Sequence, residues 1–355
     1  MYARSKIFRL SLALTLLCGV FSCDDRGNYY QIRGYAQGGE YSVKYKEASS
    51  GIPPERVSEV IDSILVSIDF SLSGYNGNSL LSSFNRGETI TPDEHFIKAY
   101  EISYKYFERS EGALDVAAGP LFDIWGFGFT SDSLPGRERI DSVLVRCGMK
   151  RLVPDIRSAI RPDGTLSPSD LLMEGEDPGV LPRLNFNAIA QGYSCDVIAG
   201  YLYAIGVRDM LVDIGEIYCD GLNPGGKGWS VGIDRPVDGN DTPGADLDGI
   251  WRSDGGGTGL VTSGNYRKFY IRDGRKFSHT IDPRTGYPAE NNLLSATVSA
   301  PTAADADALA TWCMVAGLEG AKAVILGDPS LEAFLIYDEG GTMSEWSSPG
   351  FLTAE

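Results

Sequence analysis

The sequence contains few histidines, few cysteines and too little positive charge to balance its carboxylates. Only His95 and His279 are histidines, so a metal site built from several histidines is excluded. The four cysteines beyond residue 100 are far apart and form no CxxC pair, which argues against a disulfide framework, a zinc site and a thiol nucleophile. Lys and Arg number 31 against 48 Asp and Glu, a net charge of −17. A nucleic-acid surface is excluded, because phosphate contacts need Lys and Arg.

The chain is long and apolar enough to bury a large core. Of its 355 residues, 43% are hydrophobic, too many for an intrinsically disordered chain. Its 43 glycines and 18 prolines follow no triplet period, which excludes collagen and indicates many turns. A strand-rich or mixed fold is therefore expected.

The N-terminus has the features of an export signal. Arg4, Lys6 and Arg9 form a basic segment, and the apolar run over 10–17 is too short for a comfortable membrane span. We predict a signal peptide over residues 1–22. Its removal takes away three positive charges and no carboxylate, so the net charge of the remaining chain becomes −20.

The cysteine after this signal has a predicted role of its own. Residues 20–22 before Cys23 resemble a lipoprotein signal-peptidase site, so we expect Cys23 to be the lipidated first residue of the exported chain. The alternative is an ordinary signal peptide in which Cys23 is incidental. A polar tether is expected over 23–33, followed by one domain over 34–350.

Hydrophobic periodicity predicts an α+β fold in a single domain, with mixed, largely antiparallel sheets and packed helices. Helices are expected over 54–68, 93–107, 189–205 and 302–315, the third ending at Gly206 and the last capped by Thr302. Strands are expected over 41–45, 210–214, 229–233 and 294–300, and a hairpin joins 266–271 to 276–281 through Asp273-Gly274. Residues 130–182 read as irregular with short β-like runs such as 142–145, and 237–259 read as a loop.

The densest group of reactive side chains lies between residues 278 and 311. His279, Asp282 and Arg284 leave a strand and enter a turn, a place where function is often found. Asp307 and Thr311 share one face of a helix, and their oxygens suit a hard cation such as Mg²⁺. The alternative is that Asp305 and Asp307 only favour the positive end of the helix. For Asp305 we prefer that alternative, and for Asp307 both interpretations stay open.

Two further segments carry weaker signals. The segment 184–196 begins a helix with small residues, where backbone N–H groups favour an anion such as a pyrophosphate, although packing explains such residues equally well. The segment 112–128 is a glycine-rich loop with aromatics, which by itself is typical of a core or a lid.

These three segments, in this order, resemble the ApbE-type FAD:protein FMN transferases. The resemblance covers roughly residues 34–338, and its most specific parts are the SHTIDPRTG run over 278–286 and the ADALAT run over 306–311. Three other segments are similar to motifs of the same family: Ser71–Tyr75 with Ser79 and Asn85, Asp213–Gly215 with the run up to Pro236, and Thr262–Tyr266.

The resemblance implies Mg²⁺-dependent transfer of FMN from FAD to a Thr or Ser hydroxyl of an acceptor protein, with release of AMP. The acceptor would be a periplasmic or membrane-bound electron-transfer protein, and the enzyme an exported, membrane-anchored lipoprotein facing the periplasm. Two alternatives stay open: an FAD pyrophosphatase that gives FMN and AMP, and a non-catalytic flavin-binding lipoprotein.

The family's functional positions carry over to this sequence residue by residue. His279 is the expected base, since an imidazole accepts a proton at neutral pH, and Asp282 joins it in the catalytic group with ordering of the turn as its expected role. The expected metal ligands are Asp307, Thr311 and the carbonyl of Ala188. The positions expected to contact FAD are Gln37, Tyr75, Ala113, Leu114, Asp115, Asn185, Gln191, His279 and Ile281.

Some positions depart from the commonest family pattern. Gln37 stands where the family has Met, which puts a Met contact to the cofactor in doubt. Asn185 and Gln191 replace an Asp and a Lys, so a hydrogen bond between the two amides is one way to substitute for an ion pair. Gly215-Glu216 is one glycine shorter than the family's GGE.

Overall fold

The computed structural model describes residues 27–127, 135–237, 239–240, 242, 244–265, 269–272, 275–278, 280–351 and 353–354. Three predicted features lie outside these residues: the signal peptide, the lipidation site Cys23 and the candidate base His279. For the segments 269–272, 275–278 and 353–354, only the backbone is described.

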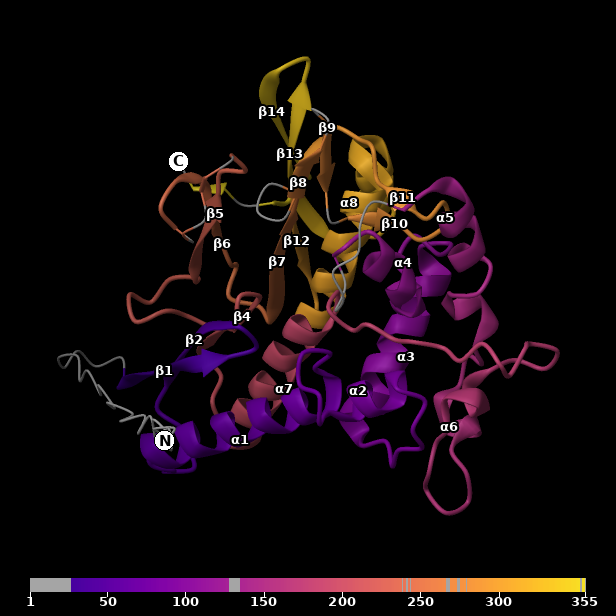
Figure 1. Cartoon of the computed structure of the whole chain (residues 1–355). Helices are drawn as coiled ribbons and strands as arrows, with labels where there is room; N and C mark the ends of the chain where they lie inside the picture. Colours follow the sequence, from indigo (N-terminus) through magenta and orange to yellow (C-terminus); the bar gives the residue numbers. More distant parts are fainter. Residues whose placement is uncertain are drawn as a thin grey trace, which may run out of the picture.

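An eight-stranded antiparallel sheet forms the centre of the described chain (Figure 1). Its order is β1-β2-β3-β4-β7-β12-β13-β14, and every neighbouring pair is antiparallel. The strands are β1 (Tyr29–Ala36), β2 (Gly39–Lys46), β3 (Met210–Asp213), β4 (Ile217–Asp220), β7 (Thr258–Gly264), β12 (Leu293–Ala300), β13 (Glu332–Glu339) and β14 (Thr342–Ser347).

Three long helices cover one face of this sheet. Val43 of β2 and Val212 of β3 are buried in one cluster with Ile61 of α1 and Ile198 of α7, while α8 packs on β7 and β12. The helices are α1 (Pro54–Leu72), α2 (Leu80–Asn85), α3 (Glu94–Arg109), α4 (Gly119–Ile124), α5 (Arg137–Leu144), α6 (Ile156–Ala159), α7 (Ala190–Ala204) and α8 (Ala303–Leu326), with short 3₁₀ turns η1 (Val116–Ala118), η2 (Met149–Arg151) and η3 (Pro168–Leu171).

A small sheet covers the other face of the large one. Leu211, which alternates with Met210 and Val212 along β3, is buried in a separate cluster with Trp229 and Trp251. This alternation gives each strand one face toward the helices and one toward the small sheet. The small sheet is β5 (Ser230–Asp234), β6 (Leu247–Arg252) and β15 (Thr353–Ala354), and two hairpins remain: β8 (Phe269–Arg272) with β9 (Arg275–Ser278), and β10 (Ile281–Asp282) with β11 (Tyr287–Pro288).

Most of the predicted elements are present. The four predicted helices correspond to α1, α3, α7 and α8, and the predicted strands to β2, β3, β5 and β12. Gly206 follows α7 with φ +87°, which fits a glycine after a helix end. Thr302 caps α8 by accepting from the N–H of Asp305 at 3.1 Å. The hairpin is also confirmed, because Arg272 pairs with Arg275. The predicted α+β fold class is confirmed.

Three predictions about segments were wrong. Residues 29–33 belong to β1 and pair with β2, so the tether predicted over 23–33 ends too late. The β-like run over 142–145 lies instead at the end of helix α5, whose one buried residue is Ile140. The loop predicted over 237–259 contains strand β6 and the start of β7. Strand β6 includes aspartate and glycine, but it still pairs with neighbouring strands and buries Trp251.

Helix α8 is interrupted near its middle. Gly317 has φ +71° and ψ −179°, which is not helical, so α8 consists of two helical stretches joined by a kink. The side chain of Asn291 lies against Gly317 and donates to the carbonyl of Met314 at 2.9 Å. This bond satisfies a carbonyl that an unbroken helix would pair internally.

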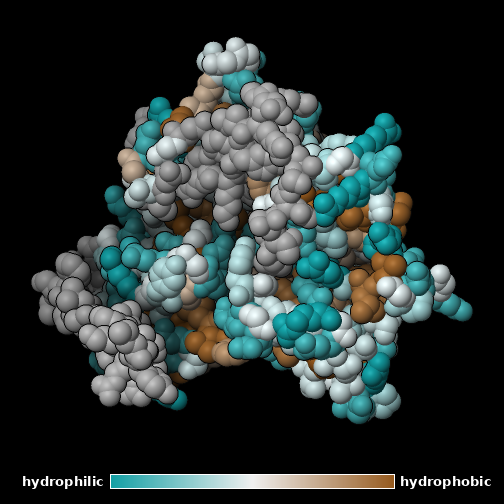
Figure 2. Space-filling view, viewed as in Figure 1, coloured by the Kyte–Doolittle hydropathy of each residue, from teal (hydrophilic) through white to brown (hydrophobic). Residues whose placement is uncertain are grey.

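The surface is mixed in character. On the face shown in Figure 2, hydrophobic residues lie in separate patches among hydrophilic ones. Helix α8 is the one described helix long and apolar enough for a membrane span, but it packs against β7, β12 and α7. It is therefore the core helix of the domain.

Candidate functional site

Helices α7 and α8 run antiparallel and are joined by hydrogen bonds at two successive turns. The N–H of Gly192 in α7 donates to Oδ2 of Asp307 in α8 at 3.2 Å, and one turn later Asp196 contacts the start of α8. A move of four residues toward the C-terminus of α7, from 192 to 196, therefore corresponds to a move of four residues toward the N-terminus of α8, from 307 to 303. Ala188 lies in the turn that leads into α7, four residues before Gly192, and Thr311 lies one turn beyond Asp307 on α8. Of the three predicted metal ligands, Asp307 lies at the contact of the two helices.

Asp307 is a buried carboxylate. Its side chain is 4% exposed, and no Lys or Arg among the described residues forms an ion pair with it. Burial raises the pKa of Asp307 to about 7, and the charge of Asp196 adds to that rise while the bond from Gly192 opposes it. A carboxylate in this environment is stabilised by a bound cation.

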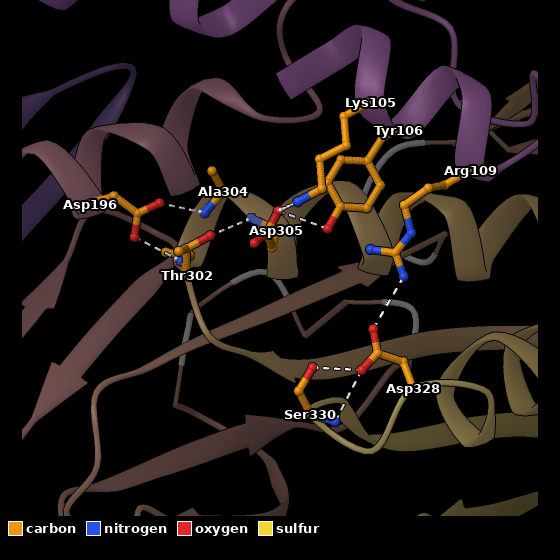
Figure 3. A network of polar contacts seen from close by, with 10 residues as sticks. Lys105, Tyr106, Arg109, Asp196, Thr302, Ala304, Asp305, Asp328 and Ser330 are labelled. Atoms are coloured by element: carbon orange, nitrogen blue, oxygen red, sulfur yellow. Dashed lines mark hydrogen bonds and ion pairs between the residues drawn. The ribbon is translucent and has the colours of Figure 1, made fainter. Parts of the chain in front are cut away.

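Asp196 and Asp305 have structural contacts at the start of α8 (Figure 3). Asp196 accepts from the N–H groups of Ala303 and Ala304, and burial raises its pKa to about 6 although both N–H bonds act against that rise. Asp305 pairs with Lys105 at 2.7 Å and accepts from the Tyr106 hydroxyl at 2.8 Å. The structural interpretation preferred for Asp305 agrees with these contacts.

The segment expected to line the FAD site lies beside the entrance to α7. The N–H of Asn185 donates to the carbonyl of Val116 at 2.8 Å, which places 113–116 next to 185–188. Ala113 and Leu114 are buried. Asp115 caps η1 and accepts from the N–H of Met149, and burial raises its pKa to about 6.

The segment before α7 is held by asparagines. Asn85 brackets Leu184, donating to its carbonyl and accepting from its N–H, both at 2.8 Å. Asn185 accepts from the N–H of Asn187, whose own amide donates to the Tyr75 hydroxyl at 3.5 Å. Tyr75, 73% exposed, therefore lies at the open side of the site.

Gln191 and Asn185 do not bond to each other, so the proposed amide pair is wrong. Gln191 donates instead to the backbone carbonyl of Ile214 at 3.0 Å, while the side-chain Oδ1 of Asn185 accepts the backbone N–H of Asn187. The turn after Ile214 contains Gly215 with φ +95°. Gln191 therefore ties the start of α7 to the turn between β3 and β4.

The tip of the β1–β2 hairpin also reaches α7. Gln37 has φ +52°, an uncommon conformation for a residue other than glycine, and its amide donates to the Ser194 hydroxyl at 2.6 Å. Ser194 donates its one proton to the carbonyl of Ala190, so the amide nitrogen of Gln37 must face it. The other end, Oε1, is buried and has no partner among the described residues.

Asp282 orders the turn after β10. Both of its carboxylate oxygens bind the Arg284 guanidinium at 2.9 Å, and its Oδ1 also accepts the N–H of Arg284. Ile281 is buried in a cluster with Leu121 and Trp125. The indole of Trp125 donates to the carbonyl of Gly286 at 2.8 Å, so this turn lies against the 113–125 segment. The catalytic assignment of Asp282 stays a prediction.

Several of the predicted site residues meet around the start of α7. It contacts α8 through Gly192, the hairpin tip through Ser194, the β3–β4 turn through Gln191 and the 113–116 segment through Asn185. Gly192 and Asp196 were not among the predicted site residues. The four-residue spacing between this glycine and this aspartate was the available signal.

One N–H group at the N-terminus of α7 has a carboxylate partner from the chain itself. The N–H of Gly192 already donates to the Asp307 carboxylate. The same glycine also lets α7 lie close to α8, because it has no side chain. A Cβ at Gly192 would lie 2.3 Å from the carbonyl oxygen of Ala303. This helix start therefore binds a carboxylate of the chain itself.

Comparison with known proteins agrees with this arrangement of segments. A family model described as the ApbE family matches residues 37–335. The chain belongs to the ApbE family. An FAD:protein FMN transferase of Escherichia coli strain K12 is 32% identical over 318 residues, covering 86% of this chain and 85% of that protein. One of Haemophilus influenzae is 29% identical over 354 residues, covering 97% and 96%.

Solved structures of the ApbE family share this fold. The flavin transferase ApbE from Vibrio cholerae superposes with a TM-score of 0.74 at 28% identity, covering 91% of this chain and 99% of that one. The flavinyl transferase ApbE of Pseudomonas stutzeri gives the same TM-score and identity, covering 94% and 95%. The predicted family, enzyme class and single-domain fold are thereby confirmed.

Proposed function

We propose that this chain transfers FMN from FAD to a Thr or Ser hydroxyl of an acceptor protein and releases AMP, with Mg²⁺ bound at Asp307, Thr311 and the carbonyl of Ala188. The observation that carries the proposal is the register of α7 on α8. The buried carboxylate of Asp307 contacts Gly192 at the start of α7, Thr311 follows one turn later on α8, and Ala188 lies four residues before Gly192. Three oxygen donors of this kind are what Mg²⁺ prefers.

The residues present fit a divalent cation. Asp307 is a buried carboxylate that accepts one hydrogen bond within the described part of the chain, from Gly192 to Oδ2, which leaves Oδ1 for a metal. No group of three His, Cys, Asp or Glu side chains capable of holding a metal occurs among the described residues, so the remaining ligands would be Thr311, the Ala188 carbonyl, water and substrate. When bound, Mg²⁺ neutralises charge on the pyrophosphate.

The chain's own residues orient the reacting groups. The acceptor hydroxyl oxygen attacks the phosphorus of the FMN half, the bond to the bridging oxygen breaks, and AMP leaves with that oxygen. His279 is proposed to take the hydroxyl proton. Asp282 holds Arg284 and thereby fixes the turn that follows His279. Gln37 offers Oε1 as an acceptor for a donor N–H of the substrate.

The test combines the purified chain, FAD, Mg²⁺ and a purified acceptor domain. Covalent transfer leaves flavin fluorescence on the acceptor band of a denaturing gel and yields AMP. Release of AMP with free FMN and no labelled acceptor would instead identify a pyrophosphatase. FAD that binds but stays intact for hours would overturn both and identify a flavin-binding protein. Omission of Mg²⁺ is the control for the metal.

We further propose that the chain is exported and anchored in a membrane, facing the periplasm, through a lipid on Cys23. The basic and apolar segments before Cys23 support this. In the native host, the wild-type chain is expected in the membrane fraction and Cys23→Ala in the soluble periplasmic fraction, with transfer activity unchanged. Membrane association of Cys23→Ala equal to wild type would contradict the anchor.

A further inference from the structure

Asp196 provides the first turn of α8 with hydrogen-bond acceptors that α8 lacks. Its two carboxylate oxygens accept from the N–H of Ala303 at 2.8 Å and of Ala304 at 2.9 Å (Figure 3). Asp196 lies on α7, so these two N–H groups are capped by a neighbouring helix, while Thr302 caps the N–H of Asp305. Such a contact fixes where one helix starts relative to the other.

The other N–H groups at this helix start have partners within α8 itself. Thr302 accepts from Asp305 through its hydroxyl at 3.1 Å and from Ala306 through its carbonyl at 3.0 Å. Ala303 and Ala304 are buried, so water cannot replace Asp196 as their partner. Each unpaired buried N–H costs about 1–3 kcal/mol, which makes this contact a strong restraint on α8.

The restraint is transmitted directly to the proposed metal ligand. Asp307 lies one turn beyond Ala303, and Gly192 lies one turn before Asp196, so the two helices are pinned at successive turns. The absent side chain of Gly192 lets α7 approach the carbonyl of Ala303. A change in the start of α8 therefore moves Asp307 relative to Ala188.

We propose that Asp196 is a positioning residue of the flavin-transfer site: it sets the start of α8 and so holds Asp307 and Thr311 at the right distance from the Ala188 carbonyl. The inference rests on the proposed function, since it concerns the metal of that site. Mg²⁺ requires near-ideal octahedral geometry, so small displacements of a ligand weaken binding. Groups that orient metal ligands typically account for 10–100-fold in metal affinity.

Asp196→Asn is the informative variant, with Asp305→Asn as its matched control. The Asn keeps the shape of Asp196 but has one acceptor oxygen in place of two, so one N–H loses its partner. Asp305 belongs to the same first turn of α8, but its carboxylate contacts Lys105 and Tyr106 on α3. Each variant removes one carboxylate near the site. The two differ mainly in the contacts that are lost, which are the N–H groups of α8 for Asp196 and the side chains of α3 for Asp305.

The measurement is Mn²⁺ affinity of the full chain by electron paramagnetic resonance, with Mg²⁺ competition and a thermal melt of each variant. Asp196→Asn is expected to bind Mn²⁺ 10–100-fold more weakly than wild type while still folded, and Asp305→Asn within about threefold of wild type. Equal Mn²⁺ affinity of Asp196→Asn and wild type would overturn the positioning role. Absence of Mn²⁺ binding by wild type would overturn the proposed metal site as well.

A second variant covers the case in which Asp196→Asn does not fold. Asp196→Glu keeps the charge and both acceptor oxygens, but it places them one methylene further from α7 and so displaces the start of α8. The same weakening of Mn²⁺ binding is expected for this folded variant. Wild-type Mn²⁺ affinity in Asp196→Glu would count against the proposal.

Discussion

Asp307 is the residue whose environment differs most from that of an ordinary carboxylate. It is buried, its hydrogen bond comes from one backbone N–H, and no cation of the described chain pairs with it. Removing a charge from water without a partner costs free energy, which appears here as the raised pKa. The metal-free protein therefore carries an electrostatic cost at the position where the proposed function needs a metal.

That cost gives a pH-dependent prediction for Asp307→Asn. The folded pKa of Asp307 is about 7, above the unfolded value of about 4, so wild type loses stability as pH rises through this window. The Asn variant has no such loss. Without metal, it is expected to match wild type near pH 4 and to be more stable at pH 8, by on the order of 2–4 kcal/mol. Thermal melts across pH measure this.

Mg²⁺ supplies the control for the same variant. Saturating Mg²⁺ is expected to raise the melting temperature of wild type at pH 8 and to leave Asp307→Asn unchanged, because only the native carboxylate binds the ion. AMP release from FAD is expected to fall at least 100-fold in the variant. Parallel pH profiles of the two proteins would show that ionised Asp307 does not destabilise the fold. Equal responses to Mg²⁺ would show that Asp307 is not a metal ligand.

At the scale of elements, the contact of α7 with α8 is the feature on which the site depends. Gly192 is a point of close approach, because a Cβ added there would meet the backbone of Ala303. Backbone atoms cannot rotate away as a side chain can, so the helices would have to separate. The same helix holds Gly200, which is exposed and has no atom within 4 Å of an added Cβ.

These two glycines make a matched pair of substitutions. Gly192→Ala is expected to destabilise the protein by about 1–3 kcal/mol through overpacking. Gly200→Ala is expected to stabilise it by about 0.5–1 kcal/mol, since alanine is the better helix former. Urea unfolding measures both. If Gly192→Ala were as stable as Gly200→Ala, the close approach of α7 and α8 would be disproved.

The elements that could be predicted from the sequence are those with a strong hydrophobic period. The predicted helix over 54–68 has a full stripe of apolar residues, of which Val57, Ile61, Leu65 and Ile68 are buried. Helix α5 was misread because it fully buries only Ile140 and half-buries Val143 and Leu144, while its other residues are polar and exposed, so its hydrophobic period is faint. Strand β6 was missed because it carries Asp and Gly and is stabilised by pairing with β5.

The candidate site shows the same division. The place of Asp307 and Thr311 on one helix face was predictable because four residues separate them. The roles of Gly192 and Asp196 depend on a helix more than 100 residues away, and no local pattern states which helices will touch. The partner of Gln191 is likewise a carbonyl from a distant turn. Residue types could be predicted, but their long-range partners required the fold.

At the scale of the whole molecule, the three layers place the site at one end of the large sheet. The hairpin tip at Gln37, the turn at Ile214 and the start of α7 meet there, joined by the bonds of Ser194 and Gln191. The small sheet on the opposite face contributes none of the predicted site residues. Its residues Trp229 and Trp251 are instead buried in the cluster that includes Leu211 of β3.

The kink at Gly317 divides α8 into two units that can open separately. The backbone hydrogen-bond ladder is interrupted there, and the stretch after it is more exposed than the stretch that carries Asp307. Amide hydrogen exchange is expected to show strong protection over residues 307–315 and weaker protection over 320–326. One uniform level of protection along α8 would contradict this. Fluctuations at the far end of the core helix are thereby kept from reaching the carboxylate on which flavin transfer is proposed to depend.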